Sequence, residues 1–269
     1  MWALLCGVVS SGVAPVSRWT FLLAGIALTG PLVCGTSQAV NDWFDRHVDA
    51  INEPNRPIPS GRIAGRWGLY IAIGWTILSV GIAALTGKWV LIATLFGLVC
   101  AWVYSAPPFR LKTSGWVGPA VVALTYEGLS WFTGAAVMAG ALPSLHILII
   151  LLLYSVGAHG IMTLNDFKAV EGDRATGLRS LPVVLGERPA ALLASTVMAV
   201  PQIVVILLMV VWAHTVSAIA VGVVLAVQLA LMPRLVSAPA KNAPWYNATG
   251  VSLYVLGMMA AALGLGGYV

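Results

Sequence analysis

Apolar runs of the length that crosses a membrane follow one another along almost the whole chain. A helix needs about 20 apolar residues to span a bilayer, and nine runs separated by charged or turn residues fit into the 269 residues. They lie near residues 2–15, 19–40, 67–86, 88–106, 116–140, 142–164, 189–212, 213–235 and 248–268. The sequence therefore predicts an all-α integral membrane protein: one domain, residues 1–269, with nine transmembrane helices bundled around a central cavity.

The composition excludes several classes of protein. Hydrophobic residues make up 59% of the chain and charged residues only 9%, whereas an ordinary soluble domain is about 25% charged. A soluble enzyme, a disordered tail and a nucleic-acid-binding module are therefore ruled out. The three cysteines, Cys6, Cys34 and Cys100, lie inside apolar runs without the spacing of zinc ligands, so we expect them to be buried apolar residues.

The basic residues predict the orientation in the membrane. The hydrophilic segments 41–66, 107–115, 165–188 and 236–247 each follow an even-numbered apolar run, which places all four on one side. Twelve of the 14 lysines and arginines lie on that side, and only Arg18 and Lys88 lie on the other. By the positive-inside rule, we expect the hydrophilic side and the N-terminus to be cytoplasmic and the C-terminus to be periplasmic.

A first acidic cluster directly continues the second apolar run. On a helix, Asp42, Asp45 and Asp49 fall within about 60° of one another, with Asn41 one turn before Asp45. Three carboxylates on one face repel each other unless a cation neutralises them. Mg²⁺ is suited to such oxygen ligands, because it usually binds one or two carboxylates together with a substrate phosphate. The cluster therefore predicts Mg²⁺ as the cofactor.

A second acidic cluster follows the sixth apolar run. Asp166 and Asp173 share a helical face if the helix continues between them, and Gly172 makes this continuation less favourable. Both clusters open with Asn-Asp at the same end of an even-numbered run, which indicates a parallel internal repeat. The predicted metal ligands are Asp42, Asp45, Asp49, Asp166 and Asp173, and the same residues with Asn41 are the candidate catalytic residues. The alternative is a solvated helix end whose acids pair with neighbouring arginines.

Basic residues on the same side of the membrane complete this candidate site. An anion held by the metals could be contacted by Arg56, Arg110, Lys112, Lys168 and Arg179. Carboxylates, Mg²⁺ and basic side chains together describe a diphosphate site. It would lie at the membrane surface, with an apolar chain entering the bundle beneath it.

The motifs in these segments resemble a known family. Residues 41–63, NDWFDRHVDAINEPNRPIPSGRI, resemble the N-D-x-x-D-x-x-x-D signature of the UbiA superfamily of intramembrane prenyltransferases. Residues 104–112, YSAPPFRLK, and 165–186, NDFKAVEGDRATGLRSLPVVLG, are similar to its chlorophyll and bacteriochlorophyll synthase branch, most of all to the bacteriochlorophyll synthases. The resemblance extends to about residue 190, with a matching span count beyond. The second cluster is spaced less regularly than in the superfamily, which leaves Asp166, Glu171 and Asp173 as alternative ligands.

This resemblance implies a reaction. A C20 prenyl group, geranylgeranyl or phytyl, would pass from its diphosphate to the propionate carboxylate of bacteriochlorophyllide or, alternatively, chlorophyllide. Metal and basic groups would stabilise the departing diphosphate, and a dry pocket would protect the allylic cation from water. The implied location is a bacterial inner membrane or an intracytoplasmic photosynthetic membrane, with the active site facing the cytoplasm. The implied partners are the lipid bilayer and pigment-assembly machinery, but no nucleic acid.

Five residues are candidates for the substrate pocket. Tyr104, Tyr126 and Trp131 are candidates for the wall around the prenyl group or cation, with ordinary packing as the alternative. Glu127 lies inside a span, where a carboxylate costs about 2.5–3.5 kcal/mol. It either faces the cavity or makes a buried hydrogen bond to a neighbouring helix. His159, one turn before the second cluster, is a candidate ligand for a pigment magnesium.

Other functions remain as alternatives. A quinone or haem prenyltransferase of the same superfamily would have the same site with a different acceptor. A CDP-alcohol phosphotransferase would need a D-G-x-x-A-R pattern, which this sequence lacks. A cation transporter usually places its site near the bilayer midplane. Eight of the nine carboxylates here lie at the cytoplasmic edge, which favours an enzyme.

Overall fold

In a computed structural model, the chain folds as a bundle of helices. The structure describes the backbone of residues 1–269 and every side chain except those of Asn52 and Thr176. Within this described chain, strand pairing is limited to one isolated bridge, between Ser114 and Arg179. The α-helices are α1 (Trp2–Ser10), α2 (Trp19–Ala27), α3 (Val33–Asn52), α4 (Trp67–Thr86), α5 (Lys88–Ser105), α6 (Val117–Ala123), α7 (Ser130–Ala139), α8 (Leu145–Asp166), α9 (Val170–Thr176), α10 (Leu181–Leu185), α11 (Glu187–Val211), α12 (Thr215–Ser237) and α13 (Pro239–Leu265).

Four short helical segments connect or extend these helices. Two are 3₁₀ turns, η1 (Pro15–Arg18) and η3 (Leu111–Thr113). The other two are π-helical turns, η2 (Leu28–Leu32) and η4 (Leu124–Leu129). Since η2 joins α2 to α3 and η4 joins α6 to α7, each π turn lies inside a continuous helical run. Such turns occur frequently at functional sites.

Eight helical runs in the described chain are long and apolar enough to cross a membrane. The prediction of an all-helical membrane protein is therefore confirmed. The predicted first span, residues 2–15, instead contains the nine-residue helix α1. Nine residues rise only about 14 Å, which is less than half of the roughly 30 Å hydrocarbon core. Helix α1 packs against α7 and α13, and the Trp2 indole Nε1 donates to the carbonyl oxygen of Val255 at 2.6 Å.

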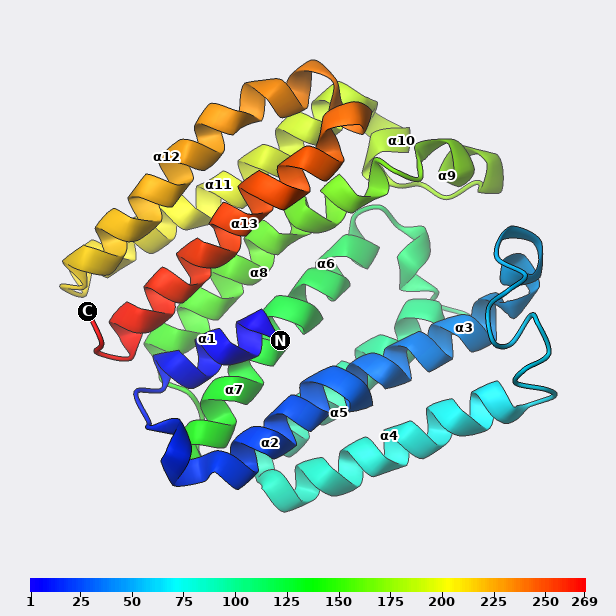
Figure 1. Ribbon diagram of the computed structural model, residues 1–269, viewed down its shortest axis with the longest axis horizontal. Helices are drawn as coiled ribbons and strands as arrows, with labels where there is room; N and C mark the ends of the chain where they lie inside the picture. The colour runs from blue at the N-terminus through cyan, green and yellow to red at the C-terminus, as the bar shows by residue number, and fades with distance from the viewer.

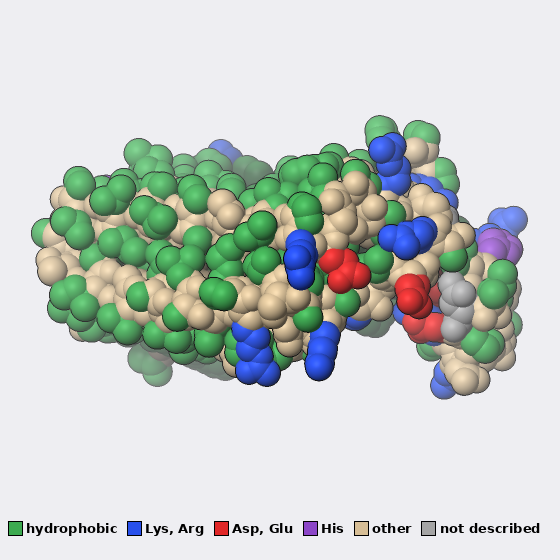
Figure 2. Space-filling model, turned by 90° about the horizontal axis from the view of Figure 1, so that it is seen from above, with side chains coloured by type: hydrophobic (Ala, Val, Ile, Leu, Met, Phe, Trp, Pro, Cys, Tyr) green, Lys and Arg blue, Asp and Glu red, His purple; other side chains and the backbone are tan. Residues whose placement is uncertain are grey.

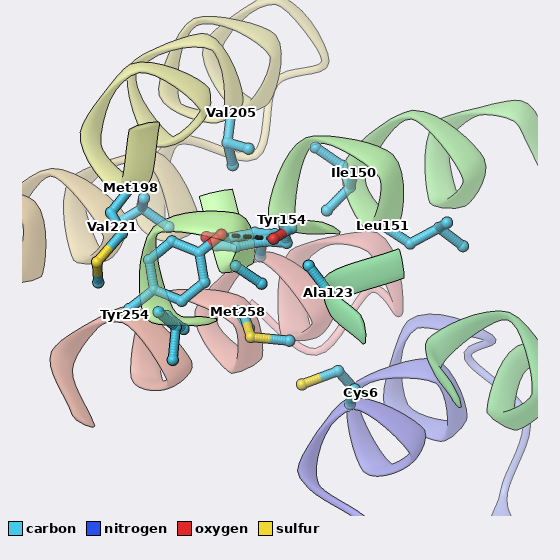
Figure 3. Packing of buried hydrophobic residues seen from close by; sticks show 14 of the residues in the cluster. Cys6, Ala123, Ile150, Leu151, Tyr154, Met198, Val205, Val221, Tyr254 and Met258 are labelled. Atoms are coloured by element: carbon cyan, nitrogen blue, oxygen red, sulfur yellow. Dashed lines mark hydrogen bonds between the residues drawn. The ribbon is translucent and has the colours of Figure 1, made fainter. Parts of the chain in front are cut away.

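The helices form two groups with a third set between them (Figure 1). Helices α2 to α5 lie together on one side, and α8, α11, α12 and α13 lie on the other. Helices α1, α6 and α7 connect the two groups. Figure 3 shows the buried core of the second group, where the Tyr254 hydroxyl donates to the backbone oxygen of Tyr154 at 2.6 Å.

The last long helix begins earlier than the apolar run near residues 248–268. Much of the predicted hydrophilic segment 236–247 is helical, because α13 begins at Pro239. Proline is well suited to the first turn of a helix, where its missing N–H group would have no partner inside the helix. The polar residues of this segment therefore lie on the first turns of α13 rather than in a loop.

The four hydrophilic segments come together at one end of the bundle. Asp45 on α3 pairs with Arg110 and Lys112 in the loop after α5. The other segments are joined by hydrogen bonds, from Gly115 N to Arg179 O at 3.0 Å and from Asn247 Nδ2 to Asn165 Oδ1 at 3.1 Å. On the face drawn in Figure 2, the acidic side chains likewise lie toward one end, while the other end is largely hydrophobic and uncharged.

Close backbone contacts hold the helices together. A Cβ atom added to Gly7 on α1 would lie 2.0 Å from the backbone oxygen of Trp131 on α7, and one added to Gly134 would lie 2.1 Å from that of Leu4. In membranes, small residues of this kind allow two helix backbones to approach closely. Helices α1 and α7 therefore contact each other through their backbones.

Gly160 on α8 provides a test of this packing. An added Cβ atom would lie 2.3 Å from the backbone oxygen of Ala194 on α11, so Gly160→Ala is expected to destabilise the protein by about 1–3 kcal/mol. The matched control is Gly81→Ala on α4, where an added Cβ atom meets nothing within 4 Å. Alanine there should leave stability unchanged or raise it, because alanine favours helix. Thermal unfolding in detergent measures both variants, and equal melting temperatures would contradict the prediction.

Candidate active site

The first acidic cluster lies at the C-terminal, charged end of α3. Because α3 continues without a break to Asn52, Asp42 and Asp49 project from one helix toward the following loop. Arg56 Nη1 lies 3.3 Å from Asp42 Oδ1 and 3.1 Å from Asp49 Oδ2, and Arg56 Nε lies 2.5 Å from Glu53 Oε2. The hydrogen bond that Arg56 donates to Glu53 and the surrounding acidic charges raise the pKa of Arg56 above its usual value.

Asp45 has a different set of partners. It pairs with Lys112, and Arg110 Nη2 lies 3.5 Å from its Oδ1. The Lys112 ammonium group also donates to Asn41 Oδ1 at 3.1 Å, which accepts a second hydrogen bond from Ser105 at 3.0 Å. Burial lowers the pKa of Lys112, and its hydrogen bond to Asp45 opposes that shift. The loop after α5 thus brings two cationic groups to α3.

The donor set at this end of α3 suits a divalent cation. Among the described residues, no three His, Cys, Asp or Glu side chains are grouped closely enough to hold a metal, because basic side chains separate the carboxylates. A single guanidinium nitrogen is nevertheless within 3.3 Å of both Asp42 and Asp49. The two carboxylates can therefore share one cation, and oxygen ligands of this type are those that Mg²⁺ takes.

The second acidic cluster does not lie on one continuous helix. Helix α8 ends at Asp166, and α9 begins at Val170, so the condition under which Asp166 and Asp173 would share one helical face is not met. The break comes at Phe167 rather than Gly172, where the Phe167 side chain turns into the core and is only 3% exposed. Asp166 and Asp173 still interact electrostatically. The two clusters flank Tyr104, which interacts electrostatically with both Asp45 and Asp166.

The five predicted basic residues divide into two sets. Arg56, Arg110 and Lys112 contact the first cluster. Lys168 and Arg179 are exposed. Lys168 interacts electrostatically with Asp166, whereas Arg179 is held through its backbone oxygen. The structure therefore brings three of the five to the carboxylates of α3.

A cavity of about 440 Å³ begins beside the first cluster. Its wall comes from α3, α5 and the α6–α7 run, and both π turns contribute to it. Asn41 and Tyr104 lie at the charged end, and Leu28 and Thr133 lie deeper. The 13 helical residues from Leu28 to Asn41 correspond to about 20 Å along the helix axis. Among the described residues, none that line the cavity is Asp, Glu, Lys or Arg.

Two of the five predicted pocket residues line this cavity, Tyr104 and Tyr126. Trp131 does not, because its ring is fully buried, stacks on Tyr154 and donates to Ser10 Oγ at 3.0 Å. His159 does not either, since its Nε2 is hydrogen-bonded to the backbone oxygen of Trp116 at 3.1 Å.

Neither of the two predicted arrangements of Glu127, facing the cavity or bonding to a neighbouring helix, is found. It lies outside the cavity wall, and among the described side chains it makes no hydrogen bond to a neighbouring helix. It is the only carboxylate in the described apolar spans away from the charged end, and it interacts electrostatically with Cys6 on α1.

Sequence reasoning missed most of the wall, including the polar residues Cys34 and Gln38 beside Tyr126. Cys34 Sγ lies 3.3 Å from the Tyr126 hydroxyl oxygen, and Gln38 is a neighbour of the same tyrosine in the wall. Their spacing from the first acidic cluster could have indicated that these residues line the cavity. Cys34, Gln38 and Asp42 are four residues apart and therefore share one face of α3.

Comparison with known proteins assigns the chain to a family. The UbiA prenyltransferase family matches residues 1–256. The chain belongs to the UbiA prenyltransferase family. The resemblance seen in its acidic motifs is thereby confirmed, and eight apolar helical runs place this UbiA member in a membrane.

Named relatives support a narrower grouping within the UbiA family. The bacteriochlorophyll synthase 33 kDa chain of Cereibacter sphaeroides is 58% identical over 267 residues, covering 99% of this chain and 88% of the relative. The corresponding chain of Rhodobacter capsulatus is 52% identical, covering 100% and 89%. Chlorophyll synthase of Arabidopsis thaliana is 39% identical over 204 residues, covering 71% of this chain and 51% of the relative.

Solved UbiA structures share the fold. A digeranylgeranylglyceryl phosphate synthase superposes with a TM-score of 0.75 at 19% identity, covering 97% of this chain and 93% of the other. A UbiA homolog from Archaeoglobus fulgidus bound to DMAPP and Mg²⁺ gives a TM-score of 0.70 at 19% identity, covering 97% and 96%. The helical bundle is therefore the UbiA fold.

Proposed function

We propose that this protein transfers a C20 prenyl group, geranylgeranyl or phytyl, from its diphosphate to the propionate carboxylate of bacteriochlorophyllide. The observation that carries the proposal is the placement of the charged cluster at one end of an uncharged cavity. A prenyl diphosphate has the same division, with an anionic head and an apolar tail. The relative from Cereibacter sphaeroides, named as a bacteriochlorophyll synthase, supports the choice of acceptor.

The charged cluster would hold the diphosphate. Asp42 and Asp49 would bind Mg²⁺, which neutralises phosphate charge and stabilises the leaving group. Arg56, Arg110 and Lys112, which contact carboxylates here, would donate hydrogen bonds to diphosphate oxygens. Asp45 would orient the Lys112 ammonium group, while Asp166, Asp173, Lys168 and Arg179 would complete the site from the side of α8 and α9.

The cavity would hold the prenyl chain and exclude water. An allylic cation reacts with any water that reaches it, so a closed apolar wall protects the reaction. Tyr104 and Tyr126, which are aromatic residues of the cavity wall, would face the reacting carbon. The acceptor carboxylate is already ionised at neutral pH, and the reaction needs no strong general base.

We further propose that the charged end faces the cytoplasm of a bacterial inner membrane or an intracytoplasmic photosynthetic membrane. The location of 12 of the 14 basic residues on that side supports this orientation. Helix α1 runs away from the charged end, since Gly12 beyond its last turn lies beside Gly266 near the C-terminus. This supports a periplasmic C-terminus. A cytoplasmic N-terminus stays a prediction, because α1 has only nine residues and Met1 lies beside Thr29 in the cavity wall. Association with pigment-assembly machinery is tested by co-purification, and recovery of this chain alone would contradict it.

A competition assay tests the proposed reaction. The purified protein in detergent is given Mg²⁺, geranylgeranyl diphosphate, and bacteriochlorophyllide and chlorophyllide in one tube, and chromatography measures the esterified pigment. We expect bacteriochlorophyllide ester to form, and chelation of the metal with EDTA to stop it. If only chlorophyllide were esterified, chlorophyllide and not bacteriochlorophyllide would be the acceptor. Diphosphate release only with a quinone precursor or haem would indicate another UbiA activity, and no release at all would favour a transporter.

A further inference from the structure

Several polar side chains of the cavity wall are satisfied within their own helices. The hydroxyl groups of Thr29, Thr125 and Thr133 donate to backbone oxygens about one turn earlier, at 2.8–2.9 Å. A hydroxyl bonded in this way has its hydrogen directed at the backbone, so it offers a ligand no donor. These positions are therefore compatible with an apolar chain.

Three wall residues near the charged end differ from these. The Tyr126 hydroxyl oxygen lies 3.3 Å from Cys34 Sγ, and the Gln38 side chain is its neighbour in the same wall. Among the described side chains, the Tyr104 hydroxyl has no hydrogen-bond partner. Tyr104 and Tyr126 line the same cavity and interact electrostatically. Gln38, Tyr104 and Tyr126 thus form a neutral donor cluster in the wall.

The position of the neutral donor cluster limits which part of the substrates it can bind. Gln38 lies one helical turn, about 6 Å, before Asp42 along α3. A prenyl tail has no polar atoms, and unmatched donors beside it would cost free energy. The diphosphate already has cationic partners outside the cavity, in Arg56, Arg110 and Lys112. The remaining polar group of the proposed reaction is the acceptor carboxylate.

We propose that Gln38, Tyr104 and Tyr126 bind the carboxylate of the acceptor and thereby select acceptors that carry a free acid. This inference rests on the proposed function. Neutral donors fit the task, because an arginine or lysine would pair strongly with the nucleophile and compete for the diphosphate. Hydrogen bonds from an amide and two phenols orient the carboxylate while leaving it the lone pair that reacts.

The chemical step balances without further reactants. One carboxylate oxygen forms a bond to C1 of the prenyl group, and the bond from C1 to the diphosphate oxygen breaks. Its electron pair leaves with the diphosphate. The products are the ester and inorganic diphosphate, and no proton is transferred. The neutral donor cluster only orients the carboxylate. It can do so next to the metal site, because Gln38 lies one helical turn before Asp42 on α3.

Acceptor kinetics test this assignment. With saturating geranylgeranyl diphosphate and Mg²⁺, Gln38→Leu, Tyr104→Phe and Tyr126→Phe are each expected to raise the KM for bacteriochlorophyllide about tenfold, the usual effect of losing one hydrogen bond to a charged group. The KM for geranylgeranyl diphosphate should stay within about twofold. Tyr70→Phe is the matched control, because Tyr70 is exposed on α4 and outside the cavity wall. Its acceptor KM should equal that of the wild type.

A second measurement separates carboxylate binding from a general effect on the pocket. Bacteriochlorophyllide and its propionate methyl ester are compared as ligands by the change in pigment absorbance on binding. The wild type should prefer the free acid, and the three variants should lose this preference. Equal weakening of acid and ester, or an unchanged acceptor KM, would overturn the carboxylate site while leaving the proposed function intact. A wild-type protein that makes no ester would overturn both.

Discussion

Asp42→Asn is expected to lower turnover by at least about 1,000-fold while the protein stays folded. A bound metal contributes several kcal/mol to the stabilisation of a departing phosphate group, and about 4 kcal/mol corresponds to a factor of 1,000. Asparagine keeps the shape of the side chain but removes the charge that a divalent cation requires. Because Arg56 Nη1 joins Asp42 to Asp49, loss of one carboxylate removes half of this shared cation site. Esterified pigment formed per minute measures the effect.

Stability is the control for this substitution. The ion pair between Asp42 and Arg56 is about one-third exposed on both sides, and such pairs contribute about 0–1 kcal/mol. The melting temperature should therefore change little. Glu187→Gln removes an exposed carboxylate at the start of α11 and should leave turnover unchanged. Near-normal turnover of Asp42→Asn would remove Asp42 from the metal site, and the same comparison with Asp173→Asn tests the second cluster.

The spans and the first acidic cluster could be predicted from sequence because each depends on local properties. Apolar runs must be helical in a bilayer, where every backbone polar group needs an internal partner. Asp42, Asp45 and Asp49 follow such a run without an intervening glycine or proline, so α3 simply continues. The second cluster could not be placed as well. Its helix ends at Asp166 and a new one begins at Val170, although no glycine or proline marks the break in the sequence.

The cavity wall was harder to predict because the π turn η4 changes the periodicity of its helix. The wall residues of this run are 121, 122, 125, 126, 129, 130 and 133, which repeat every four residues rather than every 3.6. Glu127 and Trp131 are also four residues apart and share the opposite face. Tyr126 and Trp131 therefore cannot both line the cavity. Sequence alone gave no sign of the π turn.

Gly97→Phe is expected to block long prenyl chains selectively. A Cβ atom added to Gly97 on α5 would lie 2.8 Å from Leu129 Cδ2 and 3.4 Å from Val33 Cγ1, and all three residues line the cavity. Gly97 is seven residues from Tyr104, or about 10 Å deeper along the helix. A phenyl ring there would occupy the path of a C20 tail but leave space above it for a five-carbon group.

The expected result is a change in chain-length preference. With geranylgeranyl diphosphate, kcat/KM should fall by about 100-fold, since overpacking a filled space costs about 1–3 kcal/mol. With DMAPP, diphosphate release should fall much less. Gly74→Phe on α4, where an added Cβ atom meets nothing within 4 Å, should leave the ratio of the two rates unchanged. An equal fall in the two rates would contradict the assignment of the cavity as the prenyl site.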